Sequence, residues 1–181
     1  MKKLVLLIVF LIICNHSYAN SDLITALHEG KKLIFIRHAL APGGGDPKNF
    51  DLDDCSTQRN LDSTGISQAK RIGQFFKDNN IKIDQVLSSE WCRTQDTAKN
   101  AFKYYNTFNA LNSFFSSKFA KNKKNQMKDL KVFVKKWDSK KNIVFVTHYV
   151  VILETLNTTV SSGEIVVADK NYKVIGTLEI D

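Results

Sequence analysis

Short apolar runs rich in β-branched and aromatic residues alternate along this chain with stretches of helical periodicity. Three of these runs, residues 32–36, 84–88 and 142–147, have the length and composition of buried strands. Strands that alternate with helices build a largely parallel sheet with helices packed against it. The alternation therefore predicts an α/β fold with three layers, helix–sheet–helix, around a mostly parallel central sheet.

The predicted helices follow from apolar residues spaced three and four positions apart. Asp62 or Ser63 can cap a helix whose apolar positions run from Ile66 to Phe76. Further helices are predicted over residues 91–104 and 124–137 and from about residue 150, and a closing hairpin over residues 164–168 and 172–180. Residues 42–54 are predicted to form a long loop, and the Phe- and Ser-rich segment 107–120 has no clear period.

The first 19 residues are typical of a secretory signal peptide. A basic start is followed by an apolar run of about a dozen residues and then by the small residues Ser17 and Ala19. We therefore expect cleavage after Ala19, a single domain over residues 20–181, and a periplasmic or secreted protein without stable membrane insertion. A lipoprotein signal ending at Cys14 is an alternative, which the bulky residue before that cysteine disfavours, and an uncleaved anchor is another.

The charge balance favours anionic partners. The whole chain has a formal net charge of +8, and removal of the two lysines of the signal leaves +6. Phosphorylated compounds and acidic glycolipids fit such a surface, whereas nucleic acid is not expected, because no nucleic-acid motif is present. The lysine-rich face of the predicted helix 124–137 has two interpretations, a patch for anionic lipid and a solvated helix face, and the second is favoured.

Cysteine usage agrees with export. Cys55 and Cys92 remain as an even pair after removal of the signal. Such a pair in an oxidising compartment is often a disulfide, which we predict here. Two separate thiols are the alternative, because the sequence does not show whether the two Cβ atoms can meet.

Histidine and arginine residues follow the ends of the predicted strands. His38 and His148 come directly after buried strands, with Arg37 beside the first, and Arg93 lies shortly after the strand over residues 84–88. Ligand sites of open α/β sheets lie outside the carboxyl ends of the strands. Parallel strands would therefore bring these side chains together. A partly desolvated cluster of cationic groups is costly unless an anion is bound. Guanidinium groups match the oxygens of a phosphate, so a phosphoryl group is the expected anion.

The predicted chemistry follows from this charge pattern. A neutral imidazole at His38 can attack phosphorus and form a phosphohistidine, which water then hydrolyses. Arg37, Arg93 and His148 would stabilise the charge on the equatorial oxygens in the transition state. Taken singly, each residue also has a structural or merely exposed alternative, so the prediction rests on their placement at three strand ends.

Four segments carry a family resemblance when they are taken in order. They are Arg37-His38-Ala39, the helix start at residues 61–69, residues 88–98 with Arg93 in their centre, and residues 146–148. This set resembles the signature segments of the histidine phosphatase superfamily, in its phosphoglycerate mutase-like branch. The resemblance spans residues 33 to about 156. It implies a phosphoglycerate mutase-like fold, a phosphoenzyme at His38, and a phosphate pocket made by Arg37, Arg93 and His148, with no metal and no other cofactor.

The chain departs from this family at the general acid. Many members carry a carboxylic acid after the second helix or directly after the second histidine, where this chain has residues 111–113, Leu-Asn-Ser, and Tyr149. Glu90, Asp46 and Glu154 are candidate substitutes, although each is also explained as a surface or capping residue. A substrate with a good leaving group tolerates the loss of acid catalysis, which contributes ~10²–10⁴-fold.

One more arginine has a role suggested by the resemblance. Arg59 lies in the loop before the first family helix, where members often place a substrate-contacting arginine. A solvated loop residue is the alternative for Arg59.

These observations predict an exported phosphatase. It would hydrolyse a phosphomonoester or related phosphate through a phosphohistidine at His38, with a phosphorylated small molecule or a glycolipid as substrate. The chain has no large lid insertion, so we expect an open site and either a bulky substrate or low selectivity. A mutase and a non-catalytic phosphate-binding module of the same fold are the alternatives. The substrate and the oligomeric state stay open.

Overall fold

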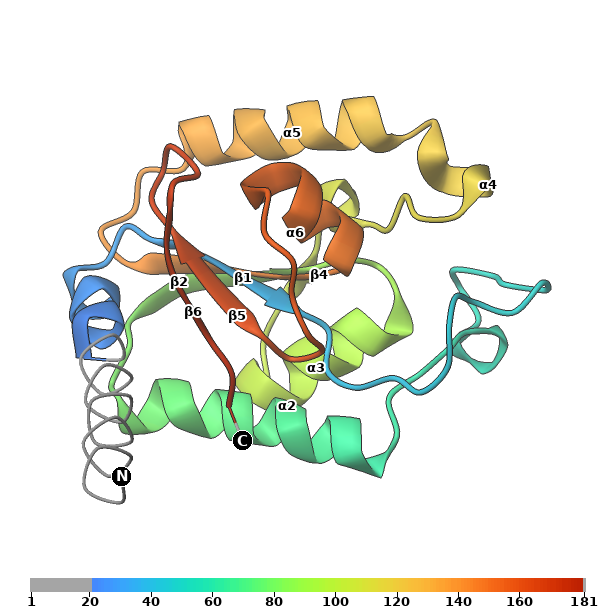
Figure 1. Ribbon diagram of the computed structural model, residues 1–181, viewed down its shortest axis with the longest axis horizontal. Helices are drawn as coiled ribbons and strands as arrows, with labels where there is room; N and C mark the ends of the chain where they lie inside the picture. The colour runs from blue at the N-terminus through green and yellow to red at the C-terminus, as the bar shows by residue number, and fades with distance from the viewer. Residues whose placement is uncertain (1–20, 181) are drawn as a thin grey trace, which may run out of the picture.

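The computed structural model describes residues 21–180, which form one six-stranded sheet with helices on both faces (Figure 1). The predicted signal peptide, with Cys14 and the cleavage point after Ala19, lies outside the described residues. The strands are β1 (Leu33–Arg37), β2 (Ile83–Ser88), β3 (Asn106–Thr107), β4 (Asn142–Thr147), β5 (Ile165–Ala168) and β6 (Val174–Leu178). Within residues 21–180, no helix has the length and apolar character needed to cross a membrane.

The sheet is mixed but mostly parallel, as predicted. Its strand order is β3-β2-β4-β1-β5-β6, and the neighbours from β3 to β1 pair in parallel. The predicted closing hairpin is present, because β5 runs antiparallel to β1 and β6 runs antiparallel to β5. The three strands that the sequence marked as buried are therefore adjacent and parallel, with their carboxyl ends at one edge.

Helices cover the two faces of the sheet. One face is covered by the helix at residues 21–29, α2 (Ser63–Asp78) and α3 (Cys92–Phe102), and the other by α5 (Lys123–Lys136) and α6 (Tyr149–Leu156). Figure 1 shows α5 and α6 on one side of the strands and α2 and α3 on the other. The three-layer prediction is confirmed.

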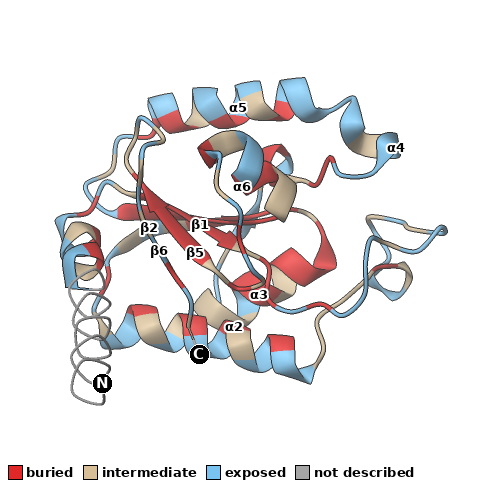
Figure 2. Ribbon diagram, in the orientation of Figure 1, coloured by how far each residue is buried: buried red, intermediate tan, exposed pale blue. Residues whose placement is uncertain are grey.

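Alternate residues of the strands enter two separate cores. On β1, Leu33 and Phe35 pack towards α5 and α6, whereas Ile34 and Ile36 pack towards α2 and α3. All four are completely buried, and Figure 2 shows the central strands almost entirely in the colour of buried residues. Burial on both faces explains why these strands read as continuous apolar runs in the sequence.

The helix α2 begins at the predicted cap. The Asp62 side chain accepts a hydrogen bond from the Gly65 backbone N–H at 2.8 Å. This bond satisfies one of the N–H groups that have no partner within the first turn of a helix.

The segment without a period, residues 107–120, has little regular structure. It contains the last residue of β3, the 3-10 turn η2 (Asn109–Leu111) and the short helix α4 (Ser117–Ala120). The predicted loop at 42–54 is also observed and leads into the 3-10 turn η1 (Cys55–Thr57). The predicted disulfide is present, because Cys55 is bonded to Cys92 at the start of α3. It ties this loop to the start of α3.

Candidate active site

A large cavity lies at the carboxyl ends of β1, β2 and β4. Its volume is 970 Å³, and its lining includes all five residues that the sequence marked as candidates: Arg37, His38, Arg59, Arg93 and His148. Backbone hydrogen bonds hold the strand ends together, from His38 N–H to the Thr147 carbonyl at 2.9 Å and from Ser89 N–H to the Val146 carbonyl at 3.0 Å. The parallel arrangement of three strands thus brings residues distant in sequence into one cavity.

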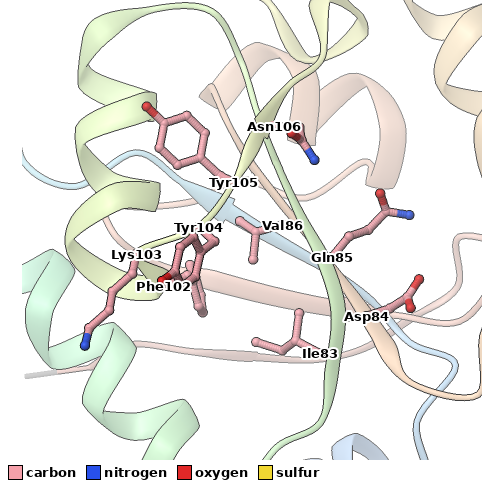
Figure 3. Close-up of a pocket in the computed structure, with 9 residues that line it drawn as sticks. All are labelled: Ile83, Asp84, Gln85, Val86, Phe102, Lys103, Tyr104, Tyr105 and Asn106. Carbon is pink, nitrogen blue, oxygen red and sulfur yellow. The ribbon is translucent and has the colours of Figure 1, made fainter.

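A second hollow of 560 Å³ lies at the other end of β2, beside β3 and the end of α3 (Figure 3). Its lining runs from Ile83 to Val86 and from Phe102 to Asn106, and it contains none of the five candidates. This lining contains no arginine and no histidine, so we place the candidate active site in the larger cavity.

His38 has the geometry of a neutral nucleophile. Only 2% of its surface is exposed, and its Nδ1 lies 2.8 Å from the Ala39 carbonyl oxygen. A carbonyl only accepts, so Nδ1 carries the proton and donates, which leaves the lone pair on Nε2. Burial, followed by the charge of Arg93, lowers the pKa of His38 to about 3. His38 is therefore uncharged at neutral pH.

Residues from α2 and α3 hold the segment after His38 in place. Thr97 Oγ1 accepts a hydrogen bond from Ala39 N–H at 2.9 Å, and Gln68 Oε1 accepts one from Leu40 N–H at 3.0 Å. A Cβ at Gly65 would lie 2.0 Å from the Leu40 carbonyl oxygen, so only glycine allows α2 to approach this closely. Gln68 and Thr97 lie in the segments that carry the family resemblance, and both fix the backbone next to His38.

His148 faces His38 across the cavity. The centroids of the two rings are 5.6 Å apart, and His148 Nε2 lies 2.8 Å from Ser89 Oγ. Burial, followed by the charge of Arg93, holds the pKa of His148 well below its ordinary value. A neutral His148 offers an anion a hydrogen bond rather than a full positive charge.

Arg93 and Arg37 each have a buried nitrogen without a hydrogen-bond partner among residues 21–180. Arg93 is 3% exposed, and its two terminal nitrogens are bonded to Asp46, whereas Arg37 Nη1 donates to the Val160 carbonyl at 2.8 Å. The Nε–H group of each arginine is buried and has no hydrogen-bond partner among residues 21–180. Buried donors of this kind are rare unless a ligand satisfies them, so both point to an anionic ligand.

Asp46 is part of this site, contrary to its interpretation as a surface or capping residue. Its carboxylate accepts hydrogen bonds from Arg93 at 2.6 and 3.2 Å and from Trp91 Nε1 at 3.0 Å. Burial alone would raise the pKa of Asp46, but the hydrogen bond and the charge of Arg93 outweigh it, so the pKa is lowered. An ionised Asp46 is a poor proton donor. The other two candidates, Glu90 and Glu154, do not line the cavity within the described residues.

Arg59 fixes the glycine-rich loop over the cavity. Its Nε donates to the Gly45 carbonyl at 2.9 Å, and its Nη1 donates to the Ala41 carbonyl. Burial, followed by the charge of Arg93, lowers the pKa of Arg59. The half-buried side chain is therefore an ordered part of the cavity wall, not a solvated loop residue.

The sequence did not indicate the aromatic part of the wall. Phe50 stacks on Trp91 with ring centroids 5.2 Å apart, and Phe119 packs edge-on against both rings. Phe50 and Phe119 come from segments without periodicity, so no pattern connected them to the histidines. In residues 21–180, no group of three or more His, Cys, Asp or Glu side chains is placed to hold a metal ion.

Comparisons with known proteins match part of the chain to a family model and most of it to a known fold. A family model described as the histidine phosphatase superfamily, branch 1, matches residues 33–107. A search of curated proteins finds no match to this sequence.

Several solved structures share the fold at low sequence identity. Protein histidine phosphatase SixA, solved with tungstate, has a TM-score of 0.58 at 12% identity, and the match covers 82% of this chain and 96% of SixA. Phosphoglycerate mutase from Thermus thermophilus has a TM-score of 0.57 at 16% identity, with 83% and 99% covered. The putative phosphohistidine phosphatase SixA from Agrobacterium tumefaciens has a TM-score of 0.54 at 16% identity, with 82% and 97% covered.

These likenesses confirm the predicted phosphoglycerate mutase-like α/β fold. The family model covers the segment from β1 to β3, which carries Arg37, His38, Arg59 and Arg93 of the five candidate residues. The predicted resemblance to the histidine phosphatase superfamily is thus supported by the family model over residues 33–107 and by the fold shared with SixA and phosphoglycerate mutase.

Proposed function

We propose that this protein is an exported phosphatase that transfers the phosphoryl group of a phosphomonoester, or of a related phosphate, to Nε2 of His38 and then to water. The observation that carries the proposal is the state of His38. Its imidazole is neutral, its Nδ1 is occupied by the Ala39 carbonyl, and its environment is rich in buried arginine donors. A neutral nucleophile among cations suits attack on an anionic phosphate.

The first step forms a phosphohistidine. The lone pair of His38 Nε2 attacks phosphorus as the bond to the leaving-group oxygen breaks. The Nε–H groups of Arg37 and Arg93 and the ring of His148 would bind the equatorial oxygens, where charge must be stabilised in the transition state. The leaving group takes its proton from solvent, because Asp46 is held ionised by Arg93. Substrates with good leaving groups should therefore react fastest.

The second step returns the enzyme to its starting state. Water attacks phosphorus, the bond to Nε2 breaks with its electron pair returning to His38, and inorganic phosphate leaves. The Nδ1 hydrogen bond to Ala39 keeps the ring in the same tautomer through both steps.

Two further observations support the proposal. SixA, which shares this fold, was solved with tungstate, a tetrahedral oxyanion similar in shape to phosphate. The bonded pair Cys55 and Cys92 suits an oxidising compartment and so agrees with export.

Hydrolysis of an aryl phosphate by the chain without residues 1–19 tests the proposal. We expect activity in the wild type and a loss of at least about 10³-fold in His38→Ala, because no other group replaces the nucleophile. The exposed His28, which bonds to the Asn79 carbonyl on the opposite side of the fold, provides the matched control His28→Ala, with full activity expected.

The outcomes separate the classes of function. Equal activity in His38→Ala and wild type would contradict the proposal. Phosphate binding without hydrolysis in any form of the protein would favour the non-catalytic binding module. Secretion with loss of residues 1–19, read by the mass of the exported protein, tests the proposed location.

A further inference from the structure

We infer that the cavity contains a second subsite, beside the phosphate pocket, for a leaving group that combines a flat apolar face with an anionic group of its own. The subsite is formed by Phe50 and Phe119 with Lys48 and Lys118, and all four line the same cavity as His38. The inference rests on the proposed function for the identity of the first subsite and adds the substrate class that the second one selects.

The aromatic wall forms a continuous path out of the phosphate pocket. The Trp91 ring lies 5.3 Å from the His148 ring, and Phe50 stacks on Trp91 at 5.2 Å. Phe119 meets Trp91 at 5.3 Å and Phe50 at 5.7 Å, measured between ring centroids. A group attached to a phosphate at His38 would therefore leave the pocket along aromatic faces, which favour aromatic rings.

A lysine lies at the outer end of this wall. Lys118 Nζ is 5.4 Å from the centroid of Phe119 and 6.0 Å from that of Phe50. These cation–π contacts place the ammonium group of the exposed Lys118 over the aromatic wall. Lys48 lines the cavity from the loop that carries Phe50. Neither lysine forms an ion pair with any carboxylate of residues 21–180.

The positive charge of the cavity lining exceeds the negative charge of one bound phosphate. Its cationic side chains are Arg37, Arg59, Arg93, Lys48 and Lys118. Asp46 is the carboxylate of this lining within the described chain, and its charge is already matched by Arg93. One phosphate dianion would balance two of the four remaining charges, so uncompensated positive charge stays on the lysine side.

The size of the cavity agrees with a substrate much larger than phosphate. Its volume of 970 Å³ lies near the upper end of the range of about 300–1,000 Å³ for pockets that take drug-sized ligands. The phosphate pocket uses only the histidine and arginine end of this volume. The rest, between Trp91 and Lys118, is available to the body of the substrate.

Two matched aryl phosphates test the subsite. Phenyl phosphate supplies the phosphate and the flat ring, and 4-carboxyphenyl phosphate adds one anionic group at the far side of the ring. Binding of both probes is measured by calorimetry on His38→Ala, which holds them without turnover, and their hydrolysis is measured separately on the wild type, because the carboxylate also makes the phenol a better leaving group. We expect the carboxylated probe to bind about two- to fivefold more tightly, as for an exposed ion pair.

Variants locate the preference. Lys118→Gln should bring the ratio between the two probes close to one, because it removes the ammonium group that distinguishes them. Phe119→Leu should weaken both probes, because the aromatic face serves the ring. Lys70→Gln, at an exposed position of α2 outside the cavity, removes the same charge and should leave the ratio unchanged.

The result that would overturn the subsite is equal binding of the two probes by His38→Ala, or equal loss of the binding preference when Lys70→Gln and Lys118→Gln are each added to it. In the first case phenyl phosphate would still be hydrolysed, so the proposed function would stand. A preference in binding by His38→Ala with no hydrolysis by the wild type would support the subsite and contradict the proposed function. Failure of both probes to bind would contradict both.

Discussion

The guanidinium of Arg93 is bonded to the carboxylate of Asp46, with 2.6 Å between Nη1 and Oδ1 and 3.2 Å between Nη2 and Oδ2. The sequence predicted that Arg93 binds phosphate, yet two of its nitrogens are already bonded to a carboxylate of the protein. Asp46 belongs to the loop over residues 42–54, so the loop and the phosphate pocket share one charge pair. A phosphate bound through Nε of Arg93 would lie beside this carboxylate and be repelled by it.

Asp46→Asn should tighten anion binding and reduce stability. The amide keeps the shape and an acceptor oxygen for Trp91 but removes the negative charge next to the phosphate position. We expect the dissociation constant of inorganic phosphate to fall about three- to tenfold and the free energy of unfolding to fall by about 1–3 kcal/mol. Calorimetry and urea denaturation measure the two effects. Weaker phosphate binding would show instead that Asp46 orients Arg93 for the ligand.

The buried histidines should make the fold sensitive to mild acid. The pKa of His38 in the folded state, about 3, is below the ordinary value of 6.5, so the unfolded state binds the proton first. The contribution of His38 is complete above pH 6.5 and is lost as the pH falls towards 3. For His38 alone the expected loss between pH 7 and pH 5 is about 2 kcal/mol of unfolding free energy.

Urea denaturation at pH 7 and pH 5 checks this expectation. The wild type should lose more stability between the two pH values than His38→Asn, which has no group to protonate at this position. An equal loss in both proteins would show that His38 is not buried in the neutral form.

The disulfide should support both the fold and the cavity. Cys55 and Cys92 are 37 positions apart, and in the chain-entropy account closing a loop of this length is worth about 4 kcal/mol. Cys92 adjoins Arg93, and Cys55 ends the loop that carries Asp46. We expect Cys55→Ser to lower the thermal midpoint and to raise KM for an aryl phosphate more than it lowers kcat. An unchanged KM with a lowered thermal midpoint would limit the disulfide to stability.

Much of this site could be predicted from the sequence because regular structure placed it. His38 and His148 directly follow buried strands, and Arg93 lies in the first turn of the helix after another, so parallel pairing alone brings them together. Asp46 and Phe119 come from segments with no helical or strand period. Their positions depend on tertiary contacts to Arg93 and Trp91, which a local pattern does not encode.

Replacement of Gly65 by alanine should lower both the stability and the activity of the protein. The added Cβ would lie 2.0 Å from the Leu40 carbonyl oxygen, so either α2 or the segment after His38 must move. Overpacking of this kind costs about 1–3 kcal/mol, and we expect the aryl phosphatase rate to fall together with the thermal midpoint. Gly44→Ala is the control for stability, because a Cβ there has no atom within 4 Å. A midpoint for Gly65→Ala equal to that of Gly44→Ala would contradict the close approach.

The central claim is that His38 carries the phosphoryl group, and rapid-quench labelling with a ³²P-labelled aryl phosphate tests it most directly. We predict a labelled protein whose phosphate is stable in alkali and released by acid, as expected for a phosphoramidate, with the label mapped to the peptide that contains His38. His38→Ala should give no label, and His28→Ala should be labelled like the wild type. Label of equal amount in His38→Ala, or turnover by the wild type with no labelled protein at any quench time, would contradict the account.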